Sequence, residues 1–542
     1  MSRAILICLL FVTPVQAQPN ILHILVEDLG WTDTSVQIDP NVLESKSDYY
    51  QTPVLEQLAA EGMRFSNAYS SSPICTPTRA AIQTGKSPAQ LQMTDNIQAA
   101  TVGGTTRNTD QPLIPPAPIV NLPLEEISIA EHLKTGNPDY RTSHHQKWGL
   151  HASSVTGPLL QGYDVANTGH MVFPEGTDPK KNEGITKRAI DFIEETVAMQ
   201  RPFYTQVSYP TVHTPHEAKQ VTIDKYTALP PGQRHTDPLY AAMVEEMDTV
   251  IGTLLVKLIE LGVDDNTYVI FTSDNGGFTG GGHPTNNFPL YDDKGSYWEG
   301  GLRVPMIVKG PGIAANTVSN TPVISHDLLP TFNDMVGNTN PAPNGLEGTS
   351  ILPILEGTST NLSRPYGPNG ELFWHGPYYW SGGQRPSSLI RDGQYKLVKQ
   401  WAEPGEDDVL FLFDLSANLT ESADPNSTLN LVDQLPEIAT AMELKLDNWL
   451  TGIGASLPKP AGADFDLTTW EVNYGQQQIG DTIPVPFQLG DANGDGIVSG
   501  NDFLDWQRKK TLGLYQVPEP TTCTLALAAL CLAMSRRRIL AR

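Results

Sequence analysis

Short apolar segments alternate with amphipathic segments over most of the chain between residues 20 and 355. Four segments have the character of strands, and three have apolar residues spaced three and four apart, as in helices that cover a sheet. The strand segments are residues 20–26, 202–208, 268–272 and 306–308, and the helical segments are residues 52–65, 186–200 and 240–261. This alternation predicts an α/β fold with a mainly parallel central sheet, whose ligands bind at the carboxyl ends of the strands.

A second, smaller pattern follows the α/β region. Residues 388–398 indicate a β-hairpin and residues 435–450 a closing helix, which together predict an α+β subdomain. Glycine, proline and glutamine then dominate without sustained periodicity, as in a linker. The predicted organisation is a large domain over residues 18–360, the subdomain over residues 361–452 and the linker over residues 453–488.

Both ends of the chain resemble sorting signals. Residues 1–17 hold Arg3, an apolar run and then small residues, the order of a secretory signal, with a buried first strand as the alternative. Residues 517–542 hold Val-Pro-Glu-Pro, an apolar stretch and three arginines, and are similar to the PEP-CTERM tails of bacterial proteins. The apolar stretch has about a dozen residues, fewer than the ~20 that span a bilayer. A plain membrane anchor and a C-terminal helix are the alternatives. The ends predict a bacterial protein that is secreted to the periplasm or cell envelope and cut by a sorting protease.

Residues 491–502 read Asp-Ala-Asn-Gly-Asp-Gly-Ile-Val-Ser-Gly-Asn-Asp. Oxygen donors stand at the first, third, fifth and twelfth positions, and glycine stands at the sixth, where a calcium loop turns sharply. The predicted ligands are Asp491, Asn493, Asp495, Ile497 through its carbonyl, and Asp502. One such loop, within residues 489–512, resembles half of a dockerin. Because a second copy is missing, we expect a calcium-stabilised module rather than a cohesin-binding one.

The chain is acidic, with a formal net charge of −25 at pH 7 and a pI near 4.8. This charge argues against a nucleic-acid partner, because phosphate backbones are repelled. A site for an anionic substrate must therefore gather positive charge locally, against the field of the whole protein.

One cysteine stands apart from the rest. Three of the four lie in the predicted sorting signals, which leaves Cys75 unpaired in an exported chain. An unpaired cysteine cannot be a disulfide staple, and its surroundings favour a chemical role over that of a small buried hydrophobe. A helix is predicted to follow it, with Thr76 as a candidate cap and Pro77 suited to the first helical position. The free N–H groups at such a helix end attract anions.

Cys75, Pro77 and Arg79 form a Cys-x-Pro-x-Arg motif that continues Ala-Ala-Ile-Gln-Thr-Gly. This motif resembles that of the formylglycine-dependent sulfatases, and the resemblance covers about residues 19–450. It implies an alkaline-phosphatase-like sandwich for the large domain, which would then be catalytic. It also implies that a formylglycine-generating enzyme converts Cys75 to an aldehyde, whose hydrate, polarised by calcium and Arg79, attacks the sulfur of a sulfate ester.

Two pairs of oxygen-bearing residues follow predicted strands. Glu27 and Asp28 follow the first of them, and Asp274 and Asn275 follow the third. Three carboxylates and one amide form an all-oxygen set, which suits calcium or magnesium rather than zinc. The sulfatase motif has two aspartates in the first pair, so Glu27 is a departure that we expect to shift a carboxylate without preventing calcium binding. Solvated turn residues are the alternative.

The resemblance also implies cationic and acid–base residues. Lys147 lies in a Lys-Trp motif, and Lys294 shortly precedes a Glu-Gly-Gly-x-Arg-Val-Pro run. Both are similar to family lysines that hold the sulfate oxygens. His213 resembles the family histidine that protonates the leaving alcohol, with His216 as its competitor.

One residue of the family pattern is missing. The motif Gly-Lys-Trp-His-Leu-Gly has a histidine where this chain has Gly149. In the family this histidine is associated with expelling sulfate from the intermediate. Here His151, His144 or His145 substitutes for it, or the step runs differently.

These features predict a sulfuric ester hydrolase that removes sulfate from sulfated polysaccharides or oligosaccharides. One alternative is a formylglycine-dependent phosphonate or phosphodiester hydrolase, which shares the nucleophile and a similar scaffold. Another is a non-catalytic carbohydrate-binding protein of the cell surface, which would explain the missing histidine. The presence of Cys75, Arg79 and Lys294 together favours an enzyme.

Overall fold

The computed structural model describes residues 18–96, 111–150, 157–167, 177–379 and 385–460. The predicted signal peptide, calcium loop and sorting tail lie outside these residues, as does most of the predicted linker. Nearly all of the described residues belong to one compact unit. A second unit includes the two-stranded antiparallel sheet of β4 (Leu113–Ile114) and β16 (Lys459–Pro460). None of the helices in the described part of the chain is long and apolar enough to cross a membrane.

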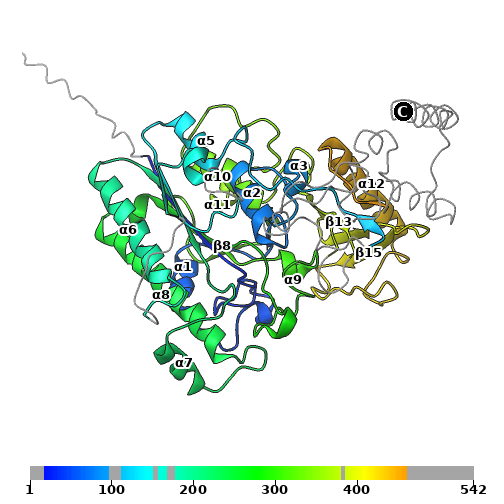
Figure 1. Cartoon of the computed structure of the whole chain (residues 1–542), viewed down its shortest axis with the longest axis horizontal. Coiled ribbons are helices and arrows are strands. Elements are labelled where there is room, and N and C mark those ends of the chain that lie inside the picture. The colour runs from blue at the N-terminus through cyan, green and yellow to red at the C-terminus, as the bar shows by residue number, and fades with distance from the viewer. Residues whose placement is uncertain (1–17, 97–110, 151–156, 168–176, 380–384, 461–542) are drawn as a thin grey trace, which may run out of the picture. The chain divides into compact units, whose positions relative to one another are not determined.

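Eight strands of the first unit form the central sheet, in the order β10-β2-β9-β8-β1-β7-β5-β6. Their bounds are β1 Asn20–Val26, β2 Met63–Phe65, β5 Arg141–Gln146, β6 Val165–Asn167, β7 Phe203–Tyr209, β8 Thr267–Ser273, β9 Met306–Lys309 and β10 Thr317–Ser319. Figure 1 shows β8 of this sheet between the helices α8 (Pro238–Glu260) and α2 (Cys75–Thr84). β9 runs antiparallel to β8 and β2, and the other neighbouring strands are parallel. The prediction of a mainly parallel sheet is therefore confirmed.

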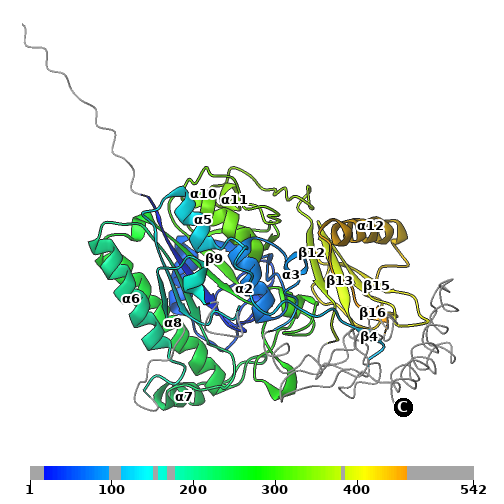
Figure 2. The same cartoon turned by 45° about the horizontal axis from the view of Figure 1, so that its top comes forward.

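Helices cover both faces of this sheet (Figure 2). One face is covered by α1 (Pro53–Glu61), α6 (Asn182–Ala198) and α8 (Pro238–Glu260), with α7 (Gln220–Thr227) packed on α8. The other face is covered by α2 (Cys75–Thr84), α5 (Ile129–Gly136), α10 (Leu328–Met335) and α11 (Leu352–Leu355). Side chains of β1 alternate between the two layers, as the period of a strand requires: Leu22 and Ile24 pack in the first core, Ile21 and Leu25 in the second.

The smaller α+β part is also present. Its antiparallel sheet consists of β12 (Leu372–Gly376), β13 (Ser387–Asp392), β14 (Tyr395–Gln400) and β15 (Val409–Asp414). One face packs against α12 (Pro436–Gly452), and the other packs against Trp298 and Leu302 of the large domain's side. β13 and β14 are the predicted hairpin, and α12 is the predicted closing helix. The first unit also contains the short elements α3 (Pro88–Leu91), α9 (Glu299–Leu302), β3 (Ala68–Tyr69) and β11 (Val323–Ile324).

One local prediction was wrong, and one strand was missed. The helix predicted over residues 52–65 ends at Glu61, and its last three residues form β2. Gly62 makes this turn possible, because a β-carbon there would lie 2.4 Å from the carbonyl oxygen of Val308. The strand β5 was not predicted, because its sequence Arg-Thr-Ser-His-His-Gln carries no apolar signal although most of it is buried.

A buried ion cluster joins the two sheets. The carboxylate of Glu299, in α9, binds Arg303 at 2.7 Å and Lys396 of β14 at 3.0 Å, and it accepts a hydrogen bond from Tyr69 at 2.8 Å. Lys396 also binds Glu421 at 2.8 Å. The Glu-Gly-Gly-x-Arg run therefore fastens the antiparallel sheet to the segment that follows Lys294.

Asp248 of α8 offers a pH-dependent test of this packing. Its carboxylate accepts hydrogen bonds of 2.9 Å from the N–H groups of Val54 and Leu55, at the start of α1. Burial raises the pKa of Asp248 to about 7, although these two hydrogen bonds lower it. Because the folded-state pKa lies above the unfolded one, the contribution of Asp248 to stability is greatest at low pH and is lost as the pH rises to about 7.

We expect Asp248→Asn to remove this loss, because the amide stays neutral and keeps an acceptor. The difference in free energy of unfolding, variant minus wild type, should increase by on the order of 2 kcal/mol as the pH rises from 5 to 8. Urea unfolding at four pH values in that range measures the difference. Parallel profiles for the two proteins would contradict the assignment.

Candidate active site

Four neighbouring parallel strands, β8, β1, β7 and β5, end at the same edge of the central sheet. Each is followed by residues that the sequence analysis selected. They are Asp274 and Asn275 after β8, Glu27 and Asp28 after β1, His213 after β7 and Lys147 after β5. The sheet thus brings together side chains that are up to 248 positions apart in the sequence, the separation of Glu27 and Asn275.

Cys75 is the first residue of α2, and its half-buried side chain is a free thiol. The predicted cap was wrong: Ile74 is the N-cap, and Thr76 lies inside the helix and is buried. The loop before α2 is fixed instead by Thr78, whose hydroxyl binds both the N–H and the carbonyl of Ser72. Because no described side chain caps α2, its first N–H groups remain available beside Cys75 for an anion.

Arg79 lies one helical turn after Cys75 and is buried. Its Nε donates to Asp274 Oδ2 at 3.0 Å, and its Nη2 lies 2.9 Å from the same oxygen and 3.5 Å from Glu27 Oε1. Its Nη1 donates to the carbonyl of Lys147 at 2.7 Å. One guanidinium therefore joins the ends of β1, β8 and β5.

Two lysines complete the positive charge around Cys75. Lys147 Nζ lies 2.7 Å from Glu27 Oε2, and Lys294 Nζ lies 2.6 Å from Asp28 Oδ1. Both ammonium groups interact electrostatically with Cys75. In a chain of net charge −25, this site gathers three cations around one thiol, as an anionic substrate requires.

The carboxyl groups respond to these cations in different ways. Burial alone would raise the pKa of Glu27 and Asp28, but Lys147 and Arg79 lower the first and Lys294 and His213 lower the second, so that both pKa values lie below the ordinary range. The pKa of Asp274 is raised, because burial outweighs the charge of Arg79. Three buried carboxyl groups at one place favour additional positive charge.

The oxygen atoms of the predicted metal set suit a hard cation. Asn275 Nδ2 donates to Asp28 Oδ1 at 2.9 Å, and the N–H of Asp28 donates to Asp274 Oδ1 at 3.3 Å. Asn275 Oδ1 and Glu27 Oε1 are buried and accept no hydrogen bond from the described residues. Buried oxygens among carboxylates that accept no hydrogen bond fit calcium or magnesium.

The geometry around these oxygens is that of ion pairs. Among the described residues, no three His, Cys, Asp or Glu side chains are arranged to hold a metal ion by themselves. Lys147, Lys294 and Arg79 bind the carboxylates instead. The chemistry of the donors therefore supports a metal, and the present arrangement of the side chains does not by itself form its coordination shell.

His213 and His216 lie in the same loop but in different surroundings. His213 Nε2 lies 4.0 Å from Asp28 Oδ2, and its Nδ1 lies 2.8 Å from the carbonyl of Thr214. The ring of His216 contacts Tyr240 instead, with 5.7 Å between the ring centroids. The position of His213 beside Asp28 favours it over His216 as the acid for a leaving group.

Lys180 is a part of this site that sequence reasoning missed. It precedes α6, is buried, and donates to the carbonyls of His213 at 2.7 Å and Pro215 at 2.9 Å. Burial lowers the pKa of Lys180, while Glu27 and other acidic groups raise it. A lysine whose partners are backbone carbonyls leaves no motif in the sequence, so no signal could have identified it.

The place of the missing histidine is next to the cations. Gly149 has φ of +70°, which favours glycine, and a β-carbon there would lie 3.4 Å from Cδ of Arg79. Of the proposed substitutes, His144 packs on Trp148 with 5.0 Å between centroids, and His145 packs on α6. Burial lowers the pKa of His145 to about 3 and holds that of His144 well below its ordinary value, so both are poor bases. His151 lies outside the described residues.

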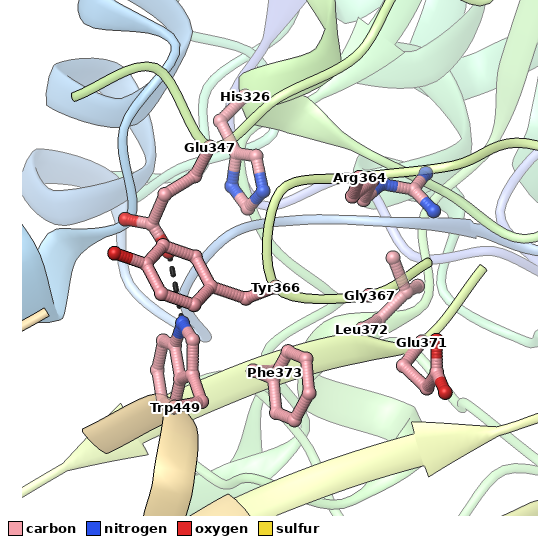
Figure 3. Close-up of a pocket in the computed structure, with 9 residues that line it drawn as sticks. All are labelled: His326, Glu347, Arg364, Tyr366, Gly367, Glu371, Leu372, Phe373 and Trp449. Atoms are coloured by element: carbon pink, nitrogen blue, oxygen red, sulfur yellow. Dashed lines mark hydrogen bonds between the residues drawn. The ribbon is translucent and has the colours of Figure 1, made fainter. Parts of the chain in front are cut away.

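A small pocket elsewhere does not belong to this site (Figure 3). It lies between α12, β12 and the segment around His326, and Trp449 Nε1 donates across it to Glu347 Oε2 at 2.9 Å. Its volume of about 10 Å³ admits a single water molecule at most. None of the predicted site residues lines it.

Comparison with protein families identifies the chain. A model described as sulfatase matches residues 19–338, which is more than half of the chain. The chain belongs to the sulfatase family. A second model, described as N-sulphoglucosamine sulphohydrolase, C-terminal, matches residues 287–450. The predicted enzyme class, a sulfuric ester hydrolase with a sulfatase fold, is thereby confirmed.

Individual relatives agree with this family. A sulfatase of Formosa agariphila is 31% identical over 520 residues, covering 80% of this chain and 89% of the relative. An N-acetylgalactosamine-6-sulfatase of Canis lupus familiaris is 29% identical over 373 residues, covering 62% and 66%. Among solved structures, that of Ps i-CgsB in complex with k-i-k-neocarrahexaose has a TM-score of 0.64 at 24% identity and covers 80% of this chain and 93% of its own. The likeness to this last structure is one of fold.

Proposed function

We propose that this sulfatase-family protein hydrolyses sulfate esters of carbohydrates, with a formylglycine formed at Cys75 and a calcium ion bound near it. The observation that carries the proposal is the convergence of Arg79, Lys147 and Lys294 on the uncapped helix end at Cys75, in a strongly acidic protein. Such a site is suited to a small anion with several hydrogen-bond acceptor oxygens, held next to a nucleophile.

The side chains of the site have separate tasks in this proposal. A formylglycine at residue 75 would supply an oxygen nucleophile that is regenerated at the end of the reaction. A thiol or a serine alcohol would be regenerated less easily. Lys147 and Lys294 hold the sulfate oxygens and stabilise the charge that moves onto them and onto the leaving oxygen. His213 holds the proton that the leaving alcohol needs. Lys180 keeps the loop of His213 in place.

Glu27, Asp28, Asp274 and Asn275 are the residues that would hold calcium, with magnesium as the alternative. Their oxygens are the donors that these cations prefer. The ion would supply positive charge beside the sulfate group and would relieve the repulsion among the three buried carboxyl groups.

Carbohydrate substrates are supported by the relatives and by the chain ends. The canine relative carries a sulfated amino sugar in its name, and its sequence is 29% identical to this chain. The predicted signal peptide and sorting tail place the enzyme, in this proposal, at the envelope of a bacterium, where large sulfated polysaccharides are encountered.

The experiment is a comparison of ester classes. The full chain, coexpressed with a formylglycine-generating enzyme, is assayed for sulfate release from galactose, N-acetylgalactosamine, glucosamine and fucose sulfates and from carrageenan oligosaccharides. A phosphonate monoester and a phosphodiester are assayed beside them. We expect carbohydrate sulfates to be preferred, with activity lost in EGTA and restored by calcium. Faster cleavage of the phosphorus esters would favour a phosphonate or phosphodiester hydrolase. Binding of sugar sulfates without turnover would favour a non-catalytic binding protein.

The role of Lys180 gives a further prediction. Lys180→Met keeps the buried stem but removes the donors to the carbonyls of His213 and Pro215, so His213 loses its position. We expect kcat to fall about 10- to 100-fold for sugar sulfates, whose alcohols need a proton, and only slightly for 4-nitrophenyl sulfate, whose phenolate leaves unaided. Lys180→Arg should restore part of the loss.

Measuring kcat for both esters in both variants separates this role from a general loss of structure. A merely structural defect lowers the two rates together. Equal losses for the sugar sulfate and the nitrophenyl ester would therefore contradict the assignment.

A further inference from the structure

Three side chains that the proposed chemistry does not use form a wall beside the candidate active site. They are Phe278, His283 and His216, and we call them the aromatic wall. The ring centroids of Phe278 and His283 are 4.1 Å apart, and those of His283 and His216 are 5.2 Å apart, with the two imidazoles nearly perpendicular at 86°. All three are partly exposed.

The chain places this wall next to the residues that hold the sulfate. His216 lies three positions after His213 in the loop that follows β7, and Phe278 and His283 lie in the segment between β8 and Lys294. His283 interacts electrostatically with Asp28, Lys294 and His213. The wall therefore lies near His213 and near the pair of Asp28 and Lys294.

Hydrogen bonds and a ring contact tie the wall to its neighbours. Asp293, the neighbour of Lys294, uses one carboxylate oxygen to accept hydrogen bonds from the N–H groups of Thr279 and Gly280 at 2.7 and 2.5 Å, and from the Thr279 hydroxyl at 3.0 Å. The loop that carries Phe278 is thereby tied to the residue beside Lys294. On the other side, Tyr240 of α8 packs edge-on against His216.

The imidazoles of the wall are available to a ligand. Within the described part of the chain, the ring nitrogens of His216 and His283 make no hydrogen bond. Partial burial lowers the pKa of both rings, and the charge of His283 lowers that of His216 further. Near neutral pH each ring thus offers one donor and one acceptor, which suits hydroxyl groups better than an anion.

We propose that the aromatic wall is the subsite for the sugar ring that carries the sulfate ester. The apolar face of the sugar lies against Phe278 and His283, and its hydroxyl groups bond to the imidazoles of His216 and His283. Sites of this kind combine an aromatic surface with a few placed polar groups. This inference rests on the proposed function and adds to it a preference for an uncharged, hydroxyl-bearing ring at this position.

The test separates the sugar from the sulfate. Phe278→Ala, His216→Ala and His283→Ala are compared with Phe288→Ala, which removes an exposed phenyl ring from the same connection outside the wall. The substrate is the monosaccharide sulfate with the highest kcat/KM among those named above, and inorganic sulfate is used as a competitive inhibitor. Inorganic sulfate reports on the cationic pocket alone.

We expect each wall variant to raise KM about tenfold or more while the inhibition constant of inorganic sulfate stays within about twofold. His283→Gln, which keeps a neutral donor and acceptor, should recover part of the loss, and Phe288→Ala should behave as wild type. An unchanged KM in the wall variants overturns the inference. A parallel rise of KM and of the sulfate inhibition constant overturns it as well, because the wall would then act on the cationic pocket.

The failure of the proposed function is distinguishable from the failure of this inference. If the wild-type protein binds monosaccharide sulfates but does not release sulfate, the proposed function fails. Isothermal titration of the monosaccharide sulfate that the wild type binds most tightly, with the same variants, then decides the inference, with a weaker Kd in the wall variants supporting it and an equal Kd overturning it.

Discussion

Cys75→Ala is expected to lower sulfate release at least about a thousandfold while leaving the free energy of unfolding nearly unchanged. The large effect on rate follows because the variant loses the group from which the proposed nucleophile is made, whereas the cations around it can only bind the ester. The small effect on stability follows because the half-buried thiol is free of any disulfide and lies at the first position of α2. Steady-state kinetics on a sugar sulfate and urea unfolding measure the two quantities.

The chemical state of residue 75 is read in the same preparation. Conversion of the thiol to an aldehyde lowers the mass of its peptide by about 18 Da, and activity should follow the converted fraction, as covalent catalysis requires. The control is a known sulfatase expressed with the same formylglycine-generating enzyme. If the control is converted and Cys75 remains a thiol, the proposed nucleophile is wrong.

Arg79→Met is expected to have the second largest effect, on stability as well as on activity. Arg79 is buried between Asp274 and Glu27, and its removal leaves two buried carboxyl groups without their shared cation. Breaking a buried pair in this way costs about 3–5 kcal/mol. Activity should fall at least about a hundredfold, because the guanidinium also joins the loops after three strands. Denaturant unfolding and kinetics report the two losses.

Two comparisons sharpen this prediction. Arg79→Lys keeps the charge but loses the forked geometry, so we expect an intermediate loss. Arg201→Met, at a partly exposed arginine that donates to the backbone carbonyls of Pro138 and Asp139 away from the site, should change neither quantity noticeably. Calcium should raise the unfolding midpoint of Arg79→Met more than that of wild type, because a divalent ion replaces the lost charge. An unfolding midpoint of Arg79→Met equal to that of wild type would show that the stability of the two buried carboxyl groups does not depend on the arginine.

The parts of the fold that could be predicted from the sequence are those with a regular apolar pattern. β1, β7, β8 and α8 were recognised because their side chains are apolar at the spacing of their structure, and the polar residues directly after β1 and β8 then marked the edge of the sheet. β5 was not recognised, because hydrogen bonds and aromatic contacts rather than apolar character bury its two histidines. A periodicity argument has no access to such burial.

The same limit applies to the site. Cys75, Arg79 and the acidic pairs could be predicted because their chemistry is local in the sequence and sits in short motifs. Lys180 could not, because its role depends on two carbonyls that only the folded loop presents. His283 could not either, because its neighbours His216 and Phe278 come from two different loops.

The buried cluster around Glu299 makes the subdomain a condition for the site rather than an addition to it. A chain cut at the predicted boundary after residue 360 would lack Lys396 and Glu421, and Glu299 would keep Arg303 as one of its two cationic partners. Glu299 lies five positions after Lys294, so the cut would loosen the segment that carries this lysine. The predicted boundary after residue 360 therefore does not separate two parts that fold independently. A chimera that exchanges the subdomain between relatives would also have to exchange α9.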